Sequence, residues 1–426
     1  MKRKAAALLG LALGLGLMGS MSLTALADFT PALDPDTTQT VKVLGNYDNF
    51  EALDAAAIAF QEYYPNIDVA YEKLDDYNAN IGPRLASDTQ AGLFMVQRYN
   101  FIENEYLPEV IADVSTLDID FDVIDPAAYA GCYIDGKLFG IPLWYRYYGM
   151  VVNLDLLEQE GLEAPSSLSD LYACADQLLA DGYVPIQQAE NSLAAYLLPK
   201  LMHVVANDYS EEESAALIAG EAGSAEGLRP VFDLMFEMIE KGYISPENMA
   251  EYEDNYNAAI LKFYEGETPL MVATSQTVSG MAKRQSLSEA YQANPFSYEF
   301  IYTPIGEDGP LVYKSDDTGF GLNKNCDYYD VATEFYRFIY TEETLNRFSE
   351  IKGLPSTLAN QTNELYSNLP EVDEASIVTY SDIDDPTGRL QDVFEDVNMA
   401  ILEGTAATTD DAIALFEELA KAQEDA

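Results

Sequence analysis

Short segments of strand type alternate with amphipathic helical segments along most of this chain. Residues 41–45 are typical of a strand, and residues 50–64 carry apolar side chains at helical spacing up to Pro65, which ends the helix. Residues 67–71 then alternate apolar and polar side chains, as a half-buried strand does. A right-handed crossover makes two such strands parallel. The alternation therefore predicts an α/β protein built around central sheets.

Similar signals continue to the end of the chain. Ser167 suits the N-cap of a helix that Gly182 closes. Further helices are expected at residues 193–205, 224–241, 255–264, 330–339, 341–350 and 408–423. Further strands are expected at residues 183–187, 269–274, 300–303 and 319–322. About 400 residues exceed what one core supports, so two or three domains are expected.

The first 27 residues have the three parts of a secretory signal. A cationic start at residues 2–4 precedes an apolar stretch at residues 5–18 and a small-x-small motif at residues 25–27. Cleavage is expected after Ala27, so we expect the mature protein outside the cytoplasm, in the periplasm or at the cell surface. Residues 17–20 resemble a lipoprotein-processing site with Ser20 in place of the lipidated cysteine, which favours a protein without a lipid anchor.

Acidic side chains far outnumber basic ones in this chain. There are 73 Asp and Glu against 22 Lys and Arg, for a net charge of −51. This charge argues against nucleic acid or anionic lipid as a partner, because binding to phosphate requires clustered Lys and Arg. Hydrophobic residues still make up 48% of the chain, which is enough for folded cores. The three cysteines are too few for a disulfide framework, and no bridge is expected.

Residues 135–153 combine a turn, two strand segments and an aromatic cluster. Asp135 and Gly136 predict a tight hairpin turn, and Pro142 predicts that the strand at residues 138–143 ends there or lies at a sheet edge. Trp144, the only tryptophan, is followed by Tyr145, Arg146, Tyr147 and Tyr148. Aromatic rings beside a guanidinium suit stacking on a sugar and hydrogen bonding to its hydroxyls. The alternative is a half-buried strand with aromatic cross-strand pairs.

Neither catalytic motifs nor metal-binding motifs are found. His203 is the only histidine and lies among apolar residues, so neither a two-histidine zinc site nor an exposed catalytic triad is expected. Dinucleotide and phosphate-loop motifs are lacking, which argues against a nucleotide cofactor. Calcium loops starting at Asp118 or Asp382 lack the required Gly and Glu. No cofactor, metal or catalytic residue is therefore expected, although two carboxylates of a glycosidase are left open.

Four segments resemble one family in their order and spacing. They are residues 59–72 (AFQEYYPNIDVAYE), residues 135–186 beginning DGKLFGIPLWYRYYGMVVN, residues 263–276 (FYEGETPLMVATSQ) and residues 318–356 beginning TGFGLNKN. Together they resemble the extracellular solute-binding proteins of ABC importers, specifically the family 1 carbohydrate binders that include maltose-binding protein. Val152, Ser169 and the residues near Leu93 depart from the family pattern.

The resemblance implies a type II periplasmic-binding-protein fold: two α/β lobes, a hinge and a ligand cleft between the lobes. After the signal at residues 1–27, it implies a first lobe of residues 28–144 plus 302–350 and a helix-rich second lobe of residues 147–300 plus 354–426. Chain crossings are then expected near residues 143–146, 300–304 and 350–355. Closure of the hinge around ligand needs no bond to be made or broken.

The resemblance also implies which residues contact ligand. They are Asn46, Tyr47 and Asp48 after the first strand, Gln97, Arg98, Tyr99 and Asn100 after the third, Trp144, Tyr145 and Arg146 at the first crossing, Gln188, Glu190 and Asn191, then Thr274, Ser275, Gln276 and Thr277 in a loop, and Asp316 and Asp317 before a strand. Amides, carboxylates and rings of this kind suit a hydroxylated ligand.

The function that this implies is binding without catalysis. We expect a monomeric, extracytoplasmic protein that binds a monosaccharide or oligosaccharide and delivers it to the transmembrane subunits of an ABC permease. Capture of another small solute, such as a polyamine, is an alternative because acidic clefts suit cations. A secreted glycosidase using paired carboxylates and a surface adhesin or scaffold are further alternatives.

Overall fold

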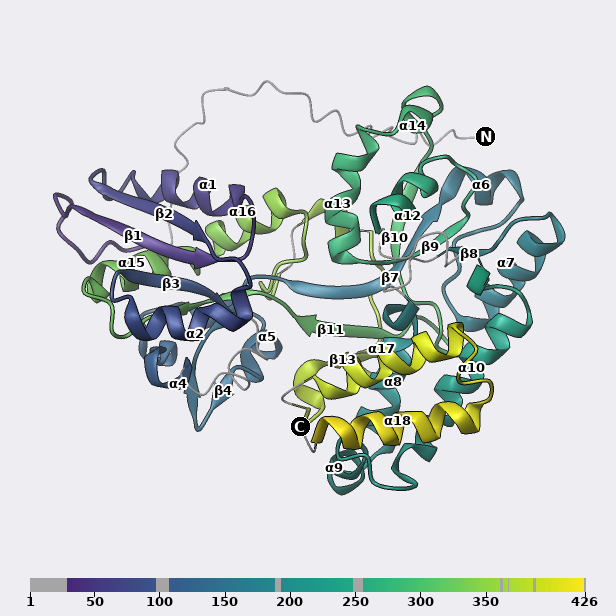
Figure 1. The fold of residues 1–426 in the computed structure, drawn as a ribbon. Helices are drawn as coiled ribbons and strands as arrows, with labels where there is room; N and C mark the ends of the chain where they lie inside the picture. Colours follow the sequence, from purple (N-terminus) through teal and green to yellow (C-terminus); the bar gives the residue numbers. More distant parts are fainter. Residues whose placement is uncertain are drawn as a thin grey trace.

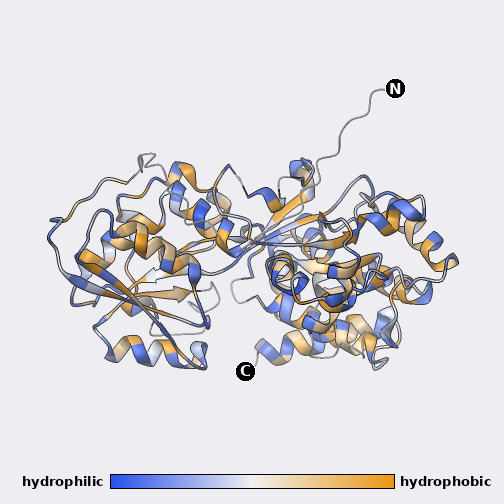
Figure 2. Ribbon diagram, turned by 90° about the horizontal axis from the view of Figure 1, so that it is seen from above, coloured by the Kyte–Doolittle hydropathy of each residue, from blue (hydrophilic) through white to orange (hydrophobic). Residues whose placement is uncertain are grey.

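The structure of the protein is a computed structural model that describes residues 29–96, 107–187, 193–247, 256–360, 363–366, 368–385 and 388–424. Figure 1 shows two α/β lobes side by side, joined in the middle by extended strands. Each lobe has its own sheet and its own apolar core. Helices of both lobes carry alternating hydrophilic and hydrophobic residues, as expected when one helix face packs on a core (Figure 2).

The first lobe is built on a five-stranded sheet in the order β2-β1-β3-β12-β6. Its strands are β1 (Gln39–Gly45), β2 (Ile67–Lys73), β3 (Ala91–Val96), β6 (Ile141–Pro142) and β12 (Gly319–Leu322). Its main helices are α1 (Glu51–Phe60), α2 (Tyr77–Ser87), α15 (Tyr329–Ile339) and α16 (Glu342–Lys352). The strand β1 is parallel to β2 and β3, and β12 runs antiparallel to β3 and β6. The predicted β-α-β opening is confirmed.

The second lobe is built on a sheet in the order β13-β11-β7-β9-β8, with β10 also paired to β7. Its strands are β7 (Tyr145–Asn153), β8 (Ile186–Gln187), β9 (Leu270–Thr274), β10 (Tyr298–Tyr302), β11 (Val312–Asp316) and β13 (Ile377–Thr379). Its helices include α6 (Leu154–Gln159), α7 (Leu168–Ala180), α8 (Leu193–Asp208), α9 (Glu211–Ile218), α10 (Arg229–Glu240), α12 (Tyr256–Phe263), α13 (Ser275–Gln285), α14 (Glu289–Ala293), α17 (Arg389–Leu402) and α18 (Thr409–Glu424). None of the helices in the described part of the chain has the length and apolarity of a membrane span.

Local sequence signals correctly predict several turns and caps. Asp135 and Gly136 have φ of 50° and 75° and join β4 (Tyr133–Ile134) to β5 (Lys137–Leu138) as an antiparallel hairpin. Pro142 lies in β6, an edge strand of its sheet. Ser167 caps α7 by accepting the N–H of Asp170 at 3.2 Å, and Gly182 follows the helix with φ of 92°.

Other elements differ from the predictions. The strand expected at residues 138–143 is divided between β5 and β6, and the strand expected at residues 183–187 shortens to β8. The helix expected at residues 224–241 begins as a 3₁₀ segment (Ser224–Leu228) before α10. The elements α2, α13, α17, β11 and β13 were not expected. Cys132, Cys174 and Cys326 are buried, and none of the three forms a disulfide.

The second chain crossing lies later than residues 300–304. The strands β10 and β11 both pair with β7, and Tyr313 stacks on Tyr148 in the second core, which keeps this segment in the second lobe. The chain passes to the first sheet between Asp316 and Gly319. The first crossing lies between Trp144 and β7, and the third follows α16. We infer a first lobe that contains the described residues between 29 and 144 and between 319 and 358, and a second lobe that contains those between 145 and 316 and between 366 and 424.

Candidate functional site

Polar side chains from two chain crossings and from helix α13 meet where the lobes join. Arg146 is the second residue of β7, Asp317 follows β11, and Gln276 lies in the first turn of α13. The Nη2 of Arg146 is 3.4 Å from Oδ2 of Asp317, and Nε2 of Gln276 donates to the same oxygen. These three side chains form the centre of what we call the junction cluster.

Tyr47 and Lys352 complete the junction cluster from the first lobe. Tyr47 follows β1, and Lys352 is the last residue of α16. The Nζ of Lys352 lies 4.4 Å from the centroid of the Tyr47 ring. Burial and the charge of Asp317 raise the pKa of Tyr47, against a hydrogen bond with Thr318. The phenol therefore stays protonated at neutral pH and is able to donate a hydrogen bond.

The junction cluster mixes two cations with one buried carboxylate. Burial disfavours the charge of Arg146, but Asp317 and then Tyr148 outweigh it, so that the pKa of Arg146 is raised. Burial lowers the pKa of Lys352, with Glu51 and Asp317 acting in the opposite direction. Arg146, Gln276, Tyr47 and Lys352 are all half-buried. The cluster therefore offers charged, amide and phenol groups at a partly open surface.

Strand pairing and helix capping place these side chains. Arg146 pairs across the sheet with Ser315, so Asp317, two residues on, lies near Arg146. The Ser275 Oγ accepts the N–H of Tyr147 at 3.1 Å, which ties the start of α13 to β7. Thr274 caps α13 through a reciprocal bond with Thr277. Gln276 is therefore held on the first turn of a helix and not on a loop.

The structure brings together four of the expected ligand contacts and gives others different roles. Tyr47, Arg146, Gln276 and Asp317 belong to the junction cluster. Asn46 and Asp48 are exposed in the loop of Tyr47, and Asp48 is paired with Lys73 at 2.7 Å. Thr274, Ser275 and Thr277 serve the helix start described above. Asp316 is paired with Tyr145 across the sheet. Gln97, Arg98, Tyr99, Asn100, Gln188, Glu190 and Asn191 lie outside the described residues.

Trp144 and Tyr145 do not lie where a ligand is able to stack on them. Trp144 is 0% exposed in the first core, with its ring centroid 6.4 Å from that of Phe50. Tyr145 is 2% exposed and packs on the other side of the junction with Tyr147. Successive side chains of an extended segment point in opposite directions, so the two rings enter different cores. Arg146 is the member of this triplet that reaches the junction cluster.

Lys352 and Thr318 were not anticipated as site residues. Lys352 ends α16 just before Gly353, where a lysine has the ordinary role of complementing the helix dipole. Its position beside Tyr47 depends on how α16 packs in the first core, where Phe348 contacts Phe50 with ring centroids 5.7 Å apart. No local signal in the chain identifies such a contact.

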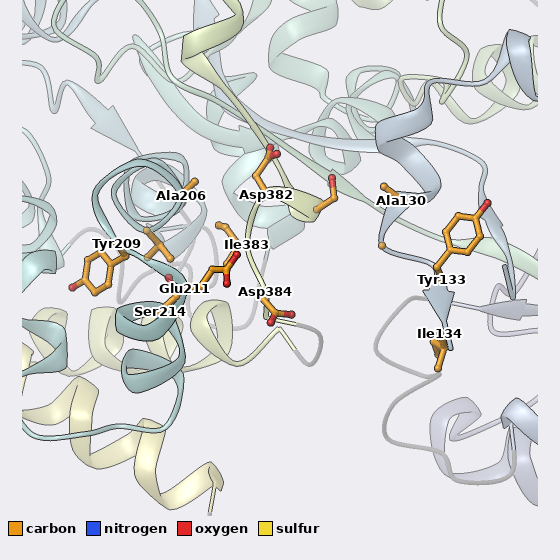
Figure 3. Close-up of a pocket in the computed structure, with 13 residues that line it drawn as sticks. Ala130, Tyr133, Ile134, Ala206, Tyr209, Glu211, Ser214, Asp382, Ile383 and Asp384 are labelled. Carbon is orange, nitrogen blue, oxygen red and sulfur yellow. The ribbon is translucent and has the colours of Figure 1, made fainter. Parts of the chain in front are cut away.

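A second feature lies between the lobes: a cavity of about 920 Å³ that shares no lining residue with the junction cluster. Tyr133 and Ile134 line it from the first lobe, and Tyr209, Asp382 and Asp384 are among the residues that line it from the second (Figure 3). Glu211 adds a third carboxylate. The chemistry of the two features differs, because the junction cluster contains cations and the cavity lining contains none.

The fold and the junction cluster define a two-lobed binding protein, and the chain belongs to the bacterial extracellular solute-binding proteins, whose family model matches residues 55–374. This confirms the predicted family and fold class. A sequence search of curated proteins finds no match.

Solved structures share the fold at low identity. A putative binding protein MsmE from Bacillus subtilis, in an open conformation, has a TM-score of 0.69 and 16% identity, with 91% of this chain and 98% of that chain covered. RafE from Streptococcus pneumoniae, in its apo form, has a TM-score of 0.68 and 14% identity, with coverages of 91% and 100%. A sugar transporter from Bacillus licheniformis in complex with stachyose has a TM-score of 0.63 and 18% identity, with coverages of 89% and 98%.

Proposed function

We propose that this protein binds a carbohydrate at the junction cluster and delivers it, chemically unchanged, to the permease of an ABC importer. The observation that carries the proposal is the convergence of Arg146, Gln276, Asp317, Tyr47 and Lys352 from both lobes at the chain crossings. A ligand held there touches both lobes at once, so its binding free energy is able to favour a closed arrangement.

The chemistry of the junction cluster suits a hydroxylated ligand. A guanidinium and an amide donate to vicinal hydroxyls, and the phenol of Tyr47 both donates and accepts. The solved structures of this fold include RafE bound to raffinose and a receptor bound to acarbose. Both ligands are oligosaccharides, which supports a carbohydrate over other solutes.

An extracytoplasmic location and a monomeric state form part of the proposal. Support for the location comes from the family, which is extracellular, and from the secretory signal expected at residues 1–27. No catalytic role is proposed, because the junction cluster contains one carboxylate and not the facing pair that a glycosidase requires.

A polyamine is the second candidate ligand. The observation that favours it is the lining of the cavity by Glu211, Asp382 and Asp384 beside Tyr133, since carboxylates and aromatic rings attract organic cations. The same binding experiment decides between the two ligand classes.

The test is a thermal-shift titration of the purified mature protein with raffinose, stachyose and spermidine. A ligand at a hundredfold excess over its Kd stabilises the protein by about 2.7 kcal/mol. We expect the oligosaccharide to shift the melting transition and to be recovered intact by chromatography. Arg146→Met should markedly reduce the shift, whereas Lys324→Met, at an exposed position outside the cluster, should leave it unchanged. A shift with spermidine alone, or recovery of cleaved sugar, contradicts the proposal.

A further inference from the structure

Asp317 differs from the other members of the junction cluster in being buried. Its side chain is 6% exposed, whereas that of Arg146 is 34% exposed. A buried carboxylate is stable only when nearby donors compensate its charge. The partners of Asp317 therefore indicate what the residue does.

These partners come from several segments of the protein itself. The Oδ2 atom accepts from Arg146 and Gln276, and the Oδ1 atom accepts from the N–H of Thr318 at 2.9 Å and from its hydroxyl at 3.2 Å. The main chain is also held, since the N–H of Asp317 donates to the carbonyl of Trp144 at 3.2 Å. Both carboxylate oxygens thus already bind protein donors.

The donors that Asp317 holds are the ones placed to meet a ligand. Arg146 and Gln276 are half-buried, so part of each side chain stays accessible although each contacts Asp317. Both side chains are long and flexible, and fixing them before binding reduces the entropy that the ligand has to offset. A buried acceptor that is bonded to two half-buried donors is a means of doing this.

From this geometry we infer that Asp317 is a positioning residue: it orients the guanidinium of Arg146 and the amide of Gln276 toward the ligand and does not itself bind the ligand. This inference rests on the proposed function and refines it, because Asp317 was expected among the ligand contacts. A positioning residue acts only through the groups it holds, which makes the two roles experimentally separable.

Asp317→Asn tests the inference, with Asp316→Asn as the matched control. Asparagine has one carbonyl oxygen in place of two carboxylate oxygens, so it is unable to accept from Arg146, Gln276 and Thr318 together. Asp316→Asn removes the same charge one residue earlier, beside Tyr145. In calorimetric titrations with the bound oligosaccharide, Asp317→Asn should weaken affinity by roughly tenfold or more, and Asp316→Asn by less than about twofold.

A double-mutant cycle distinguishes positioning from direct contact. In a protein that already carries Arg146→Met and Gln276→Ala, adding Asp317→Asn should change the remaining affinity by less than about twofold. A loss as large as in the wild-type background overturns the inference, since Asp317 then acts on the ligand or on the fold independently of both donors. An unchanged affinity for the single variant overturns it as well.

A measurement without ligand separates this inference from the proposed function. The rate at which phenylglyoxal modifies Arg146, mapped by mass spectrometry, should rise several-fold in Asp317→Asn and stay at the wild-type value in Asp316→Asn. An unchanged rate in Asp317→Asn contradicts the inference even if sugars bind. If Asp317→Asn does not fold, Asp317→Glu, which displaces the carboxylate by one methylene, replaces it in each measurement. If the wild type binds no sugar, the proposed function fails while the reactivity of Arg146 still decides the positioning role.

Discussion

At the scale of single residues, the only histidine of the chain, His203, is buried. It is 8% exposed in α8, and its Nε2 lies 3.3 Å from the carbonyl oxygen of Val312 in β11. Burial lowers the pKa of His203, in spite of nearby carbonyl groups that oppose this shift. The neutral ring therefore belongs to the packing between α8 and the second sheet, as its apolar neighbours in the sequence suggest.

The lowered pKa of His203 predicts a pH-dependent stability. A lowered folded-state pKa means that the unfolded chain binds the proton more readily, so the free energy of unfolding falls as pH drops below about 6.5 and levels off below the folded pKa. Urea unfolding at pH 7.5, 6.5 and 5.5 measures this decrease. Because the chain has one histidine, His203→Gln is a direct control and should lose less stability over the same range. If the free energy of unfolding falls equally with pH in the two proteins, carboxylates and not His203 account for the decrease, and the prediction is wrong.

Trp144 gives a prediction opposite to the one that a ligand-stacking role implies. Because its ring is fully buried in the first core, Trp144→Ala should destabilise the protein by about 3–5 kcal/mol. Tyr133→Ala, at a residue that is 44% exposed, should lower the free energy of unfolding far less. Guanidinium unfolding followed by circular dichroism measures both. If Trp144→Ala loses sugar affinity while its free energy of unfolding stays unchanged, the prediction is wrong and Trp144 contacts the ligand.

At the scale of elements, β7 is the strand on which the second lobe depends. It spans nine residues, pairs with β9, β10 and β11, and carries Arg146 at the end nearest the first lobe. Its neighbour β10 approaches closely at Gly149, where an added Cβ would lie 2.0 Å from the carbonyl oxygen of Ile301. A glycine is required here by the close approach of two backbones.

Gly149→Ala should therefore separate β10 from β7. The overpacking is expected to cost about 1–3 kcal/mol of stability, because the obstructing atom belongs to the backbone and is unable to rotate away. Gly309→Ala is the matched control, since a Cβ at that position meets no atom within 4 Å. Thermal melts of the two variants against wild type provide the comparison. Equal melting temperatures would mean that β10 moves without cost.

At the scale of the whole molecule, the charge balance dominates the response to salt. With 73 acidic and 22 basic residues, the folded surface repels itself. Raising NaCl from 0.01 M to 1 M shortens the Debye length from about 30 Å to about 3 Å, so we expect the melting temperature to rise. Sucrose at matched osmolality serves as the control, because it stabilises by exclusion without screening charge. A melting temperature that falls or stays constant in NaCl would contradict this view.

The short-range features of the fold are well predicted from the chain. The β-α-β opening, the Asp135–Gly136 turn and the Ser167 cap each depend on residues within a few positions of one another. The family can also be predicted from the sequence, because its motifs lie in order along the chain. The strand β11 was missed since its assignment depends on pairing with β7, which is more than 150 residues away in the chain.

The candidate site was also predicted only in part from the sequence. Tyr47, Arg146, Gln276 and Asp317 were named from their places after strands and at crossings, where family members contact ligand. Trp144 and Tyr145 are buried because successive side chains of this extended segment pack into two different cores. Lys352 joined the cluster only because α16 packs beside the segment that follows β1.

The sequence by itself determined the α/β class, the extreme acidity and the order of the family motifs, because each of these depends on composition or on neighbouring residues. Only the tertiary structure decided which polar groups meet at the junction and which aromatic rings are buried. Those outcomes depend on contacts between segments far apart in the chain, and the packing that creates them exists only in the folded molecule.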